Sequence, residues 1–291
     1  MVKNVSAVIV LYKPDIPKVI VLIEMLKSLE IRCYIVDNTP SVETLTNSVL
    51  NWRSDYIPLG KNEGIAKAQN IGIRKAIQNS AAIIILLDQD SVPSEMCLQM
   101  QINNVAENDS DISVPTIVDR KEGFEYVSNC VNSVGLLRAR PRGIHEKPFE
   151  VDVSISSGSV ISVDVFHKVG YFEESLFIDF VDIEWYFRCR SKRVLVKSDP
   201  RAVMIHSIGE KSIKKFGFRS IVHSSQRNYF KIRNPFRLVK IKTVPKMYAF
   251  KEIFSAPCHL FLQIPFSVSP LNHIKHSLLG LKDGLAILFS K

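Results

Sequence analysis

The sequence lacks the motifs of several common α/β enzyme classes. It has no G-x-G-x-x-G after a strand-like segment and no G-x-x-x-x-G-K-[ST] anywhere, which argues against ordinary dinucleotide-binding dehydrogenases and P-loop NTPases. Its five cysteines are scattered and include no C-x-x-C pair, so we expect neither a disulfide framework nor a zinc site. Internal repeats and low-complexity tracts are absent as well.

Long hydrophobic runs are also missing. No stretch reaches the roughly 18 apolar residues that a membrane-spanning helix needs. The sequence runs from Met1 into the strand-like VSAVIVLY without the apolar core and cleavage site of a signal peptide. We therefore expect a cytoplasmic protein. Its 291 residues suffice for one large domain, or for one domain with an appendage.

Acidic residues are scarce in the C-terminal third. Residues 201–291 hold 16 Lys and Arg against three acids, a local balance of +13, whereas residues 1–200 hold 22 basic and 26 acidic residues. This asymmetry predicts an anionic partner for the C-terminal third: a nucleic acid, a diphosphate or an anionic lipid. Nucleic acid is the least favoured, because the basic residues are interleaved with bulky aliphatic ones rather than grouped on one reading helix.

The first half of the sequence alternates strand-like and helix-like segments. Strand-like residues 5–12, 31–37 and 81–88 alternate with amphipathic residues 16–29, 64–78 and 96–106. This order is typical of an α/β fold with a mainly parallel sheet and helices on its faces. Shorter strand-like pieces at residues 112–118 and 127–137 predict a mixed-sheet insert over the site.

Two aspartates end the most apolar of these strands. Asp88 and Asp90 follow the run AAIIILL, where α/β sheets usually bind ligands. Residues i and i+2 of an extended chain point to the same side, so the two carboxylates converge, which is costly unless a cation lies between them. Mg²⁺ or Mn²⁺ suits such oxygen ligands and leaves positions for waters and a diphosphate. The alternative is an ordinary solvated acidic turn.

Four stretches together carry a family resemblance: IVDN at 35–38, NEGIAKAQNIGI at 62–73, DQDS at 88–91 and FIDFVDIEWYFR at 177–188. In this order they resemble the family 2 glycosyltransferases, and more narrowly the bacterial rhamnosyltransferases of surface-polysaccharide assembly. The resemblance covers roughly residues 5–234 and implies a GT-A fold with a Rossmann-like mixed sheet. It implies inverting, Mg²⁺- or Mn²⁺-dependent transfer of L-rhamnose from dTDP-L-rhamnose to a polyprenyl-diphosphate-linked oligosaccharide, as in O-antigen synthesis.

The resemblance assigns the nucleotide-sugar to several of these residues. Asp37 is expected to accept a hydrogen bond from the imide N–H of the base, or else to be a turn or cap aspartate. Asn62 and Asn70 are expected to bond the ribose or to cap the following helix, and the sequence does not decide between these roles. Gly64 lets the backbone approach a ligand or pack closely.

Three residues further along are assigned to the diphosphate end of the donor. His206, in VMIHSIGEKS, corresponds to a histidine near the metal in related enzymes, and a neutral imidazole is an acceptable third ligand beside Asp88 and Asp90; a structural histidine is the alternative. Arg227 and Arg233 lie in SQRNYFKIRNPFRL, which resembles the family's R-x-Y-Y-x-x-R-N stretch. We expect both arginines to contact the diphosphate.

The fourth stretch is expected to supply the base that deprotonates the acceptor hydroxyl. Related enzymes carry Glu-Asp where this chain has Val181-Asp182, so the resemblance assigns the base to Asp182. The departure at Val181 leaves open whether Asp179 substitutes for the missing carboxylate; in a helix the two aspartates would share a face at i, i+3, with an N-cap role as the alternative. Glu184 and Trp185 are further acceptor-side candidates, although Trp185 also suits the core.

We expect a catalytic domain over residues 1–234 and a basic amphipathic extension over residues 235–291. Pro257 and Pro265 interrupt the apolar clusters of the extension, so helices lying on the inner face of the cell membrane fit better than a spanning helix. A helical cap on the catalytic domain is the alternative.

Other activities remain as alternatives to rhamnosyl transfer. A related family 2 enzyme could use a different nucleotide-sugar, and a basic nucleic-acid-binding protein is the candidate from another class. A nucleotidyltransferase also uses paired aspartates, but it needs a glycine-rich triphosphate loop that LYKPD, after the first strand, does not supply.

Overall fold

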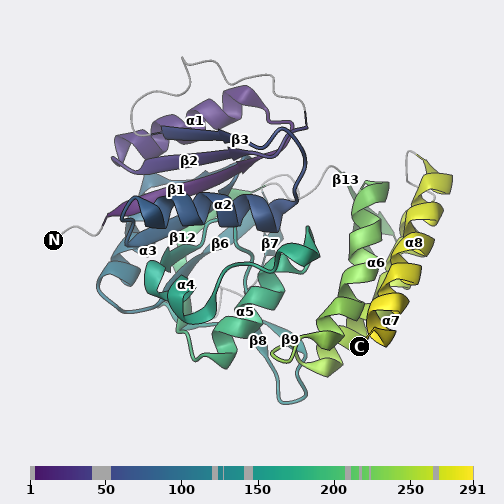
Figure 1. The fold of residues 1–291 in the computed structure, drawn as a ribbon. Coiled ribbons are helices and arrows are strands. Elements are labelled where there is room, and N and C mark those ends of the chain that lie inside the picture. Colours follow the sequence, from purple (N-terminus) through teal and green to yellow (C-terminus); the bar gives the residue numbers. More distant parts are fainter. Residues whose placement is uncertain are drawn as a thin grey trace.

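The computed structural model describes residues 4–40, 54–119, 124–126, 128–140, 147–206, 211–215, 218–222, 224–264 and 269–290. Figure 1 shows a central sheet with helices against its faces, and a group of C-terminal helices beside it. This arrangement confirms the expected α/β class with a C-terminal helical extension.

The N-terminal half alternates strands and helices close to the predicted positions. It comprises β1 (Val5–Leu11), α1 (Ile16–Ser28), β2 (Arg32–Asp37), β3 (Ser54–Pro58), α2 (Ile65–Gln78), β4 (Ile83–Asp88) and α3 (Glu95–Ala106). The four strands pair in parallel, in the order β4-β1-β2-β3. Their carboxyl ends therefore meet at one edge of the sheet.

Further strands extend this sheet into a mixed one. The added strands are β5 (Ser91–Pro93), β6 (Ile112–Asp119), β7 (Phe124–Tyr126), β10 (Phe149–Glu150), β11 (Val160–Ser162) and β12 (Val196–His206). β11 runs antiparallel to both β4 and β6, and β6 runs parallel to β12. Residues 127–137, expected as one strand-like piece, instead contain β8 (Ser128–Val131) and the turn into β9 (Leu137–Arg140), because the two strands pair as a hairpin.

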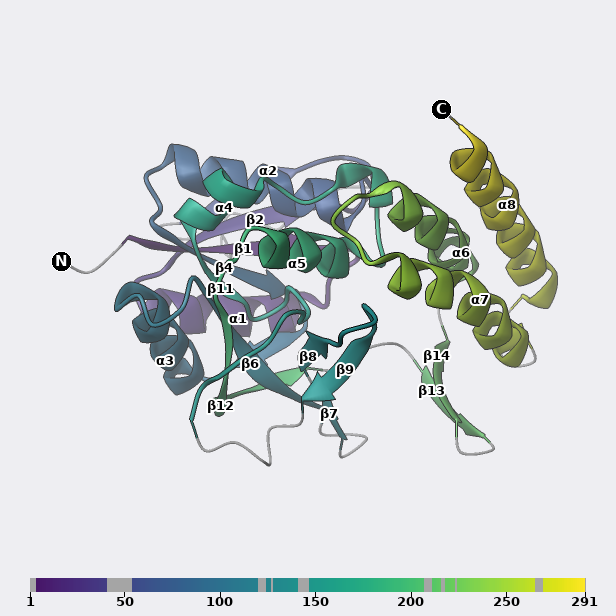
Figure 2. The ribbon, with the colours of Figure 1, turned by 90° about the horizontal axis from the view of Figure 1, so that it is seen from below.

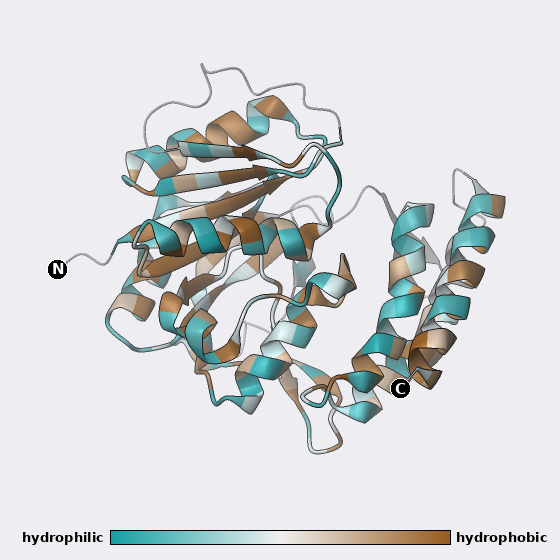
Figure 3. Ribbon diagram, viewed as in Figure 1, coloured by the Kyte–Doolittle hydropathy of each residue, from teal (hydrophilic) through white to brown (hydrophobic). Residues whose placement is uncertain are grey.

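The continuous apolar run of β4 follows from burial on both of its faces. Ile84 and Leu86 belong to one hydrophobic cluster, whereas Ile83 and Ile85 belong to a second cluster on the other side of the sheet. Because helices cover both faces of the sheet, β4 carries apolar residues on both sides and shows no alternation of apolar and polar residues. Figure 3 shows strands that are largely brown, flanked by helices in which teal and brown residues alternate.

The region after β11 contains α4 (Val163–Val169), the 3₁₀ turn η2 (Glu174–Leu176) and α5 (Val181–Ser191). After the hairpin of β13 (Lys211–Lys215) and β14 (Phe218–Val222), three helices follow: α6 (Ser225–Lys240), α7 (Lys246–Gln263) and α8 (Pro270–Phe289). The boundary expected at residue 234 falls inside α6, and the division into a catalytic domain and an extension stays a prediction. None of the helices in the described ranges is long and apolar enough to cross a membrane.

α6 and α8 pack closely against each other. A Cβ at Gly280 would lie 2.5 Å from the carbonyl oxygen of Tyr229, so only glycine allows this approach. The Tyr229 hydroxyl donates a hydrogen bond of 2.7 Å to Asp283. Figure 2 shows α6 between α5 of the main body and α8 at the periphery.

Candidate active site

The ends of the parallel strands bring together two of the residues selected from the sequence. Leu11 at the end of β1 is opposite Asp37 in β2, and Val10 is opposite Asp88 in β4. Asp37 and Asp88 therefore lie on either side of the end of β1. This is the edge at which ligands of open α/β sheets bind.

The Asp37 carboxylate is hydrogen-bonded to neighbouring residues of the protein. Its side chain is 3% exposed and accepts hydrogen bonds from the Tyr56 hydroxyl at 2.6 Å and from the Thr39 N–H at 3.0 Å. The turn role foreseen as an alternative is thus present in the structure. A contact between Asp37 and a nucleotide base stays a prediction.

Asn62 shapes the turn before α2. Its Oδ1 accepts hydrogen bonds from the Asn38 side-chain amide and from the Gly64 N–H, both at 3.0 Å. The N-cap of α2 is Gly64, not Asn62, with φ +84°. A Cβ at Gly64 would lie 2.7 Å from Phe177. Gly64 thus joins the nucleotide-side motif to the predicted acceptor-side motif.

The structure places Asn70 in the interior of α2 and not at its N-cap, where its side chain makes three buried hydrogen bonds; a contact with the ribose stays a prediction. Its amide donates to the Phe172 carbonyl and to Glu174, both at 2.9 Å, and its Oδ1 accepts from the Phe172 N–H at 2.9 Å. Its side chain is fully buried within α2. Asn70 therefore fixes the segment that leads to η2.

The DQDS turn is anchored to the neighbouring strand. Gln89 accepts a hydrogen bond from the Tyr12 N–H at 2.7 Å and donates one to the Tyr12 carbonyl at 3.1 Å. Asp88 and Asp90 on either side of Gln89 are half-buried. The backbone of His206 pairs with Ser91 in the β12–β5 ladder, but the His206 side chain lies outside the described residues. Across the part of the chain that the structure describes, no group of three His, Cys, Asp or Glu could hold a metal.

A serine dipeptide links this turn to the predicted base. The Asp88 N–H points to the Ser157 hydroxyl at 3.3 Å, and that hydroxyl lies 2.6 Å from the Ser91 hydroxyl. The adjacent Ser156 N–H donates to the Asp182 carboxylate at 3.0 Å. The end of β4 and Asp182 therefore contact neighbouring residues of one loop, although 94 positions separate them in the sequence.

The surroundings of Asp182 favour a carboxyl group that takes up a proton. Burial raises its pKa and the charge of Asp179 raises it further, while the hydrogen bond from Ser156 lowers it; the net shift is upward from 3.8. A carboxylate with a raised pKa is a better proton acceptor near neutral pH than an ordinary aspartate.

Asp179 does not share a helical face with Asp182. α5 begins at Val181 with Phe180 as its N-cap, and Asp179 precedes it with φ +60°. The Asp179 carboxylate instead pairs with Arg227 of α6 through three contacts of 2.9–3.2 Å. The expected i, i+3 arrangement is corrected, because left-handed backbone interrupts the helix before it reaches Asp179.

The two predicted diphosphate arginines differ in their surroundings. Burial lowers the pKa of Arg227, but the charges of Asp179, Asp182 and Asp88 more than offset this and raise it. Arg227 is therefore within electrostatic reach of both Asp88 and Asp182. Arg233 instead donates to the Ser175 carbonyl at 2.7 Å and to the Asn234 side chain. It therefore contacts the segment before α5 in the structure, and its contact with a diphosphate stays a prediction.

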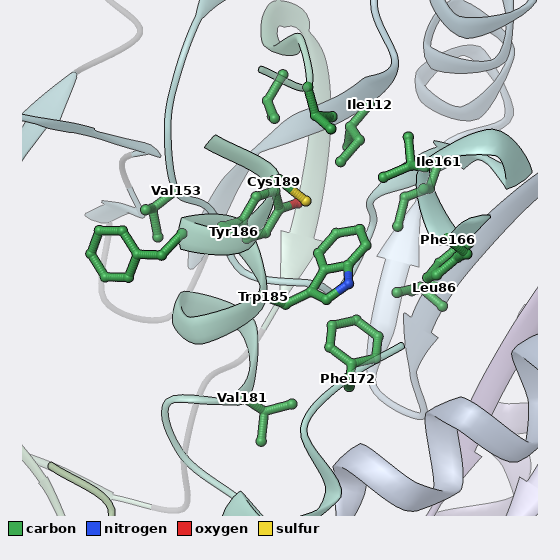
Figure 4. Close-up of a cluster of buried hydrophobic side chains, with 14 of the residues drawn as sticks. Leu86, Ile112, Val153, Ile161, Phe166, Phe172, Val181, Trp185, Tyr186 and Cys189 are labelled. Carbon is green, nitrogen blue, oxygen red and sulfur yellow. The ribbon is translucent and has the colours of Figure 1, made fainter. Parts of the chain in front are cut away.

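Glu184 and Trp185 are packed in the core. Both are 1% exposed. Glu184 pairs with Arg188 at 2.7 and 2.8 Å, and Trp185 donates to the Gly170 carbonyl at 2.8 Å. In Figure 4 the Trp185 ring lies among buried side chains, with its centroid 5.4 Å from that of Phe166. These are the contacts of core residues, which the sequence already offered as the alternative for Trp185, and the acceptor-side role stays a prediction.

Sequence reasoning missed two polar groups near these residues. Ser156 holds Asp182 through its backbone, which no side-chain motif reveals. Lys231, four residues after Arg227 on α6, is half-buried; burial lowers its pKa, while Asp179 acts in the opposite direction. The i, i+4 spacing of two basic residues in a helix-like segment was the available signal for Lys231.

Comparison with known proteins agrees with this geometry. The model of Glycosyl transferase family 2 matches residues 6–170. The chain is 36% identical over 289 residues to the dTDP-rhamnosyl transferase RfbF of Shigella flexneri, covering 98% of this chain and 96% of that protein. It is 28% identical over 254 residues to the low-salt glycan biosynthesis hexosyltransferase Agl10 of Haloferax volcanii, covering 81% of this chain and 75% of that protein.

Solved structures share the fold at low sequence identity. GalNAc-T7, crystallised with UDP, GalNAc and Mn²⁺, has a TM-score of 0.59 at 13% identity; the match covers 92% of this chain but only 56% of that one. Residues 1–349 of S. aureus TarS, in complex with UDP-GlcNAc, have a TM-score of 0.58 at 14% identity, with coverages of 98% and 81%. Together with the family model and the full-length relative, these findings lead to one conclusion. The chain belongs to glycosyltransferase family 2 and is a glycosyltransferase.

Proposed function

We propose that this enzyme transfers L-rhamnose from dTDP-L-rhamnose to a hydroxyl group of a growing surface polysaccharide such as O-antigen, with inversion at the anomeric carbon. The identity of 36% to a dTDP-rhamnosyl transferase over 98% of the chain supports this donor. The observation that carries the reaction is the Ser156-Ser157 dipeptide, which contacts Asp182 on one side and the Asp88 turn on the other.

In the proposed reaction, Asp182 removes the proton from the acceptor hydroxyl. The acceptor oxygen then forms a bond to the anomeric carbon while the bond from that carbon to the diphosphate breaks, and its electron pair leaves with dTDP. A single in-line displacement on a β-linked donor gives an α-linked sugar. Burial around Asp182, which raises its pKa, suits this proton transfer.

Asp88 and Asp90 are the residues we expect to hold a divalent metal. They are half-buried carboxylates on one turn, and Gln89 between them fixes that turn to Tyr12, which directly follows β1. Hard oxygen ligands of this kind fit Mg²⁺ or Mn²⁺. His206 is the proposed third ligand, since its backbone pairs with Ser91 beside the turn. The bound metal would neutralise charge on the departing diphosphate, and the Arg227 guanidinium would add positive charge beside Asp88.

We propose further that α8 rests on the inner face of the cell membrane, where a polyprenyl-diphosphate-linked oligosaccharide is the acceptor. Exposed apolar side chains recur on α8 every three or four residues: Leu271, Ile274, Leu278, Leu281, Leu285 and Phe289. We call this set the α8 stripe. His273 and Gly280 are buried on α8, and Gly280 faces α6. Lys275 and Lys282 follow two members of the stripe directly, and basic residues beside an apolar face suit an anionic membrane surface.

The donor assignment is tested by a panel of nucleotide-sugars. Purified enzyme with Mg²⁺ or Mn²⁺ is supplied with dTDP-L-rhamnose, dTDP-glucose, UDP-glucose, UDP-GlcNAc or GDP-mannose, and nucleotide release is measured with a lipid-linked acceptor. We expect release from dTDP-L-rhamnose alone. Comparable turnover of a UDP- or GDP-sugar would favour the alternative of a related family 2 transferase with another donor.

A further inference from the structure

The segment that leads into α5 has an unusual backbone. Phe177 has φ +67° and ψ −64°, and the Ile178 N–H donates to the Leu176 carbonyl at 2.8 Å, which closes a γ-turn around Phe177. Asp179 and Phe180 follow with φ +60° and +64°. Side-chain-bearing residues avoid these conformations, which persist only where the surroundings impose them.

The surroundings in question are one face of α6. The Asn234 side-chain amide donates to three carbonyls of the segment, those of Leu176 at 2.9 Å, Ile178 at 2.8 Å and Asp179 at 3.1 Å. On the two preceding turns of α6, Phe230 stacks on Phe177 with a centroid separation of 4.5 Å and Arg227 pairs with Asp179. We call Arg227, Phe230 and Asn234 the α6 clamp. Figure 2 shows α6 alongside α5.

Arg233 fixes the orientation of the Asn234 side-chain amide. Its Oδ1 accepts hydrogen bonds from Arg233 at 3.0 and 2.6 Å. Because a guanidinium only donates, the oxygen must face Arg233 and the NH₂ group must face the carbonyls. Asn234 is fully buried, so water cannot replace these bonds. An aspartate at this position would keep the shape and the contact with Arg233 but would present no donor to the carbonyls.

We infer that Asn234 is a positioning residue for the base Asp182. It holds the carbonyls of the γ-turn, the γ-turn sets where α5 begins, and Asp182 lies in the first turn of α5. The carboxylate must sit within hydrogen-bonding distance of the acceptor hydroxyl, and a displacement of about 1 Å can cost roughly 10²-fold in rate. This inference rests on the proposed role of Asp182, and it adds a residue that acts without touching either substrate.

Asn234→Asp and Asn234→Ala test the inference, with thermal unfolding confirming that each variant is folded. We expect kcat to fall 10- to 100-fold in both, while the dissociation constant for dTDP, measured by calorimetry, changes less than twofold. Asn234→Gln, which keeps the donor group on a longer side chain, should recover part of the loss. Asn104→Ala is the matched control, because Asn104 of α3 also donates from a helix to another element, at 3.2 Å to Asp199, but lies outside the clamp.

The pH dependence of kcat separates positioning from simple stability. Asp182 is surrounded by the Ser156 N–H and by the charges of Asp179 and Arg227. Loosening the turn admits water to Asp182 and removes part of the burial that raises the pKa of its carboxyl group. The acid limb of the kcat profile should therefore move to lower pH in both Asn234→Asp and Asn234→Ala. Asp182→Asn is assayed in parallel. If it is inactive, while both Asn234 variants keep full kcat per folded molecule and an unchanged acid limb, the inference is overturned. If Asp182→Asn is itself fully active, the proposed base is what fails.

Discussion

Replacing Asp182 by asparagine removes a proton acceptor and little else. Asparagine has the same shape, and its carbonyl oxygen can still accept the Ser156 N–H that lies 3.0 Å from the Asp182 carboxylate. General-base catalysis contributes roughly 10²–10⁴-fold, equivalent to about 2.7–5.5 kcal/mol of the barrier. We therefore expect Asp182→Asn to lose at least about 10²-fold in kcat while binding dTDP normally, since the nucleotide contacts are predicted at the ends of β2 and β4.

The same substitution should raise the stability of the folded protein, although it lowers activity. The pKa of Asp182 is raised in the folded protein, so the charged carboxylate is less stable there than in the unfolded chain. The favourable contribution of the protonated form is present at low pH and is lost as pH rises through the folded pKa. Asp182→Asn should accordingly have a higher melting temperature than wild type at pH 7, with a gap that shrinks as pH falls toward 4.

Steady-state kinetics, calorimetry with dTDP and melting curves at several pH values check these expectations together. Asp179→Asn is the comparison, because Asp179 also lies beside Arg227 but is not the proposed base, and its loss should be smaller. Near-normal transfer by Asp182→Asn, alongside an inactive Asp179→Asn, would refute the assignment.

Three further predictions address the metal, the membrane and the core. Asp90→Ala should lose divalent-ion-dependent dTDP binding while staying folded, and wild-type activity that survives excess EDTA would exclude the metal role. Leu278 of the α8 stripe is 62% exposed, and Leu278→Glu should reduce flotation with anionic liposomes. Met96 on α3 is 70% exposed, and the control Met96→Glu should not reduce flotation. Equal flotation of the two variants would make the extension a cap only. Glu184→Ala removes both the charged partner and the hydrogen-bond acceptor of the half-buried Arg188 and should destabilise the fold by roughly 3–5 kcal/mol, as removal of one member of a buried ion pair does. An unchanged melting temperature would show that this pair is dispensable.

Local patterns in the sequence predict the parallel strands β1, β2 and β4 and the edge at which they end. The apolar run of β4 and the helical spacing of α2 predict elements that the structure confirms, because burial on both faces of a strand and on one face of a helix leaves a periodic trace. Asp88 and Asp37 were found for the same reason, since each directly ends such a strand.

Contacts between distant segments could not be predicted in this way. Asn70 bonds to Phe172, 102 residues further along, and Arg227 bonds to Asp179, 48 residues earlier; neither partner has a local signature. The start of α5 was misjudged because Phe177, Asp179 and Phe180 adopt left-handed backbone, which their residue types do not favour. Contacts from α6, together with those of Gly64 and Ala66 with Phe177, impose that conformation, and such contacts are tertiary features.

The anomeric configuration of the product tests the proposed function most directly. Enzyme, dTDP-β-L-rhamnose and a lipid-linked oligosaccharide are incubated with Mg²⁺ or Mn²⁺, and the purified product is examined by NMR while dTDP release is quantified. We expect one α-linked rhamnose for each dTDP released, and product formation slowed by at least about 10²-fold with Asp182→Asn. A β-linked product, or full transfer by Asp182→Asn, would contradict the proposed function.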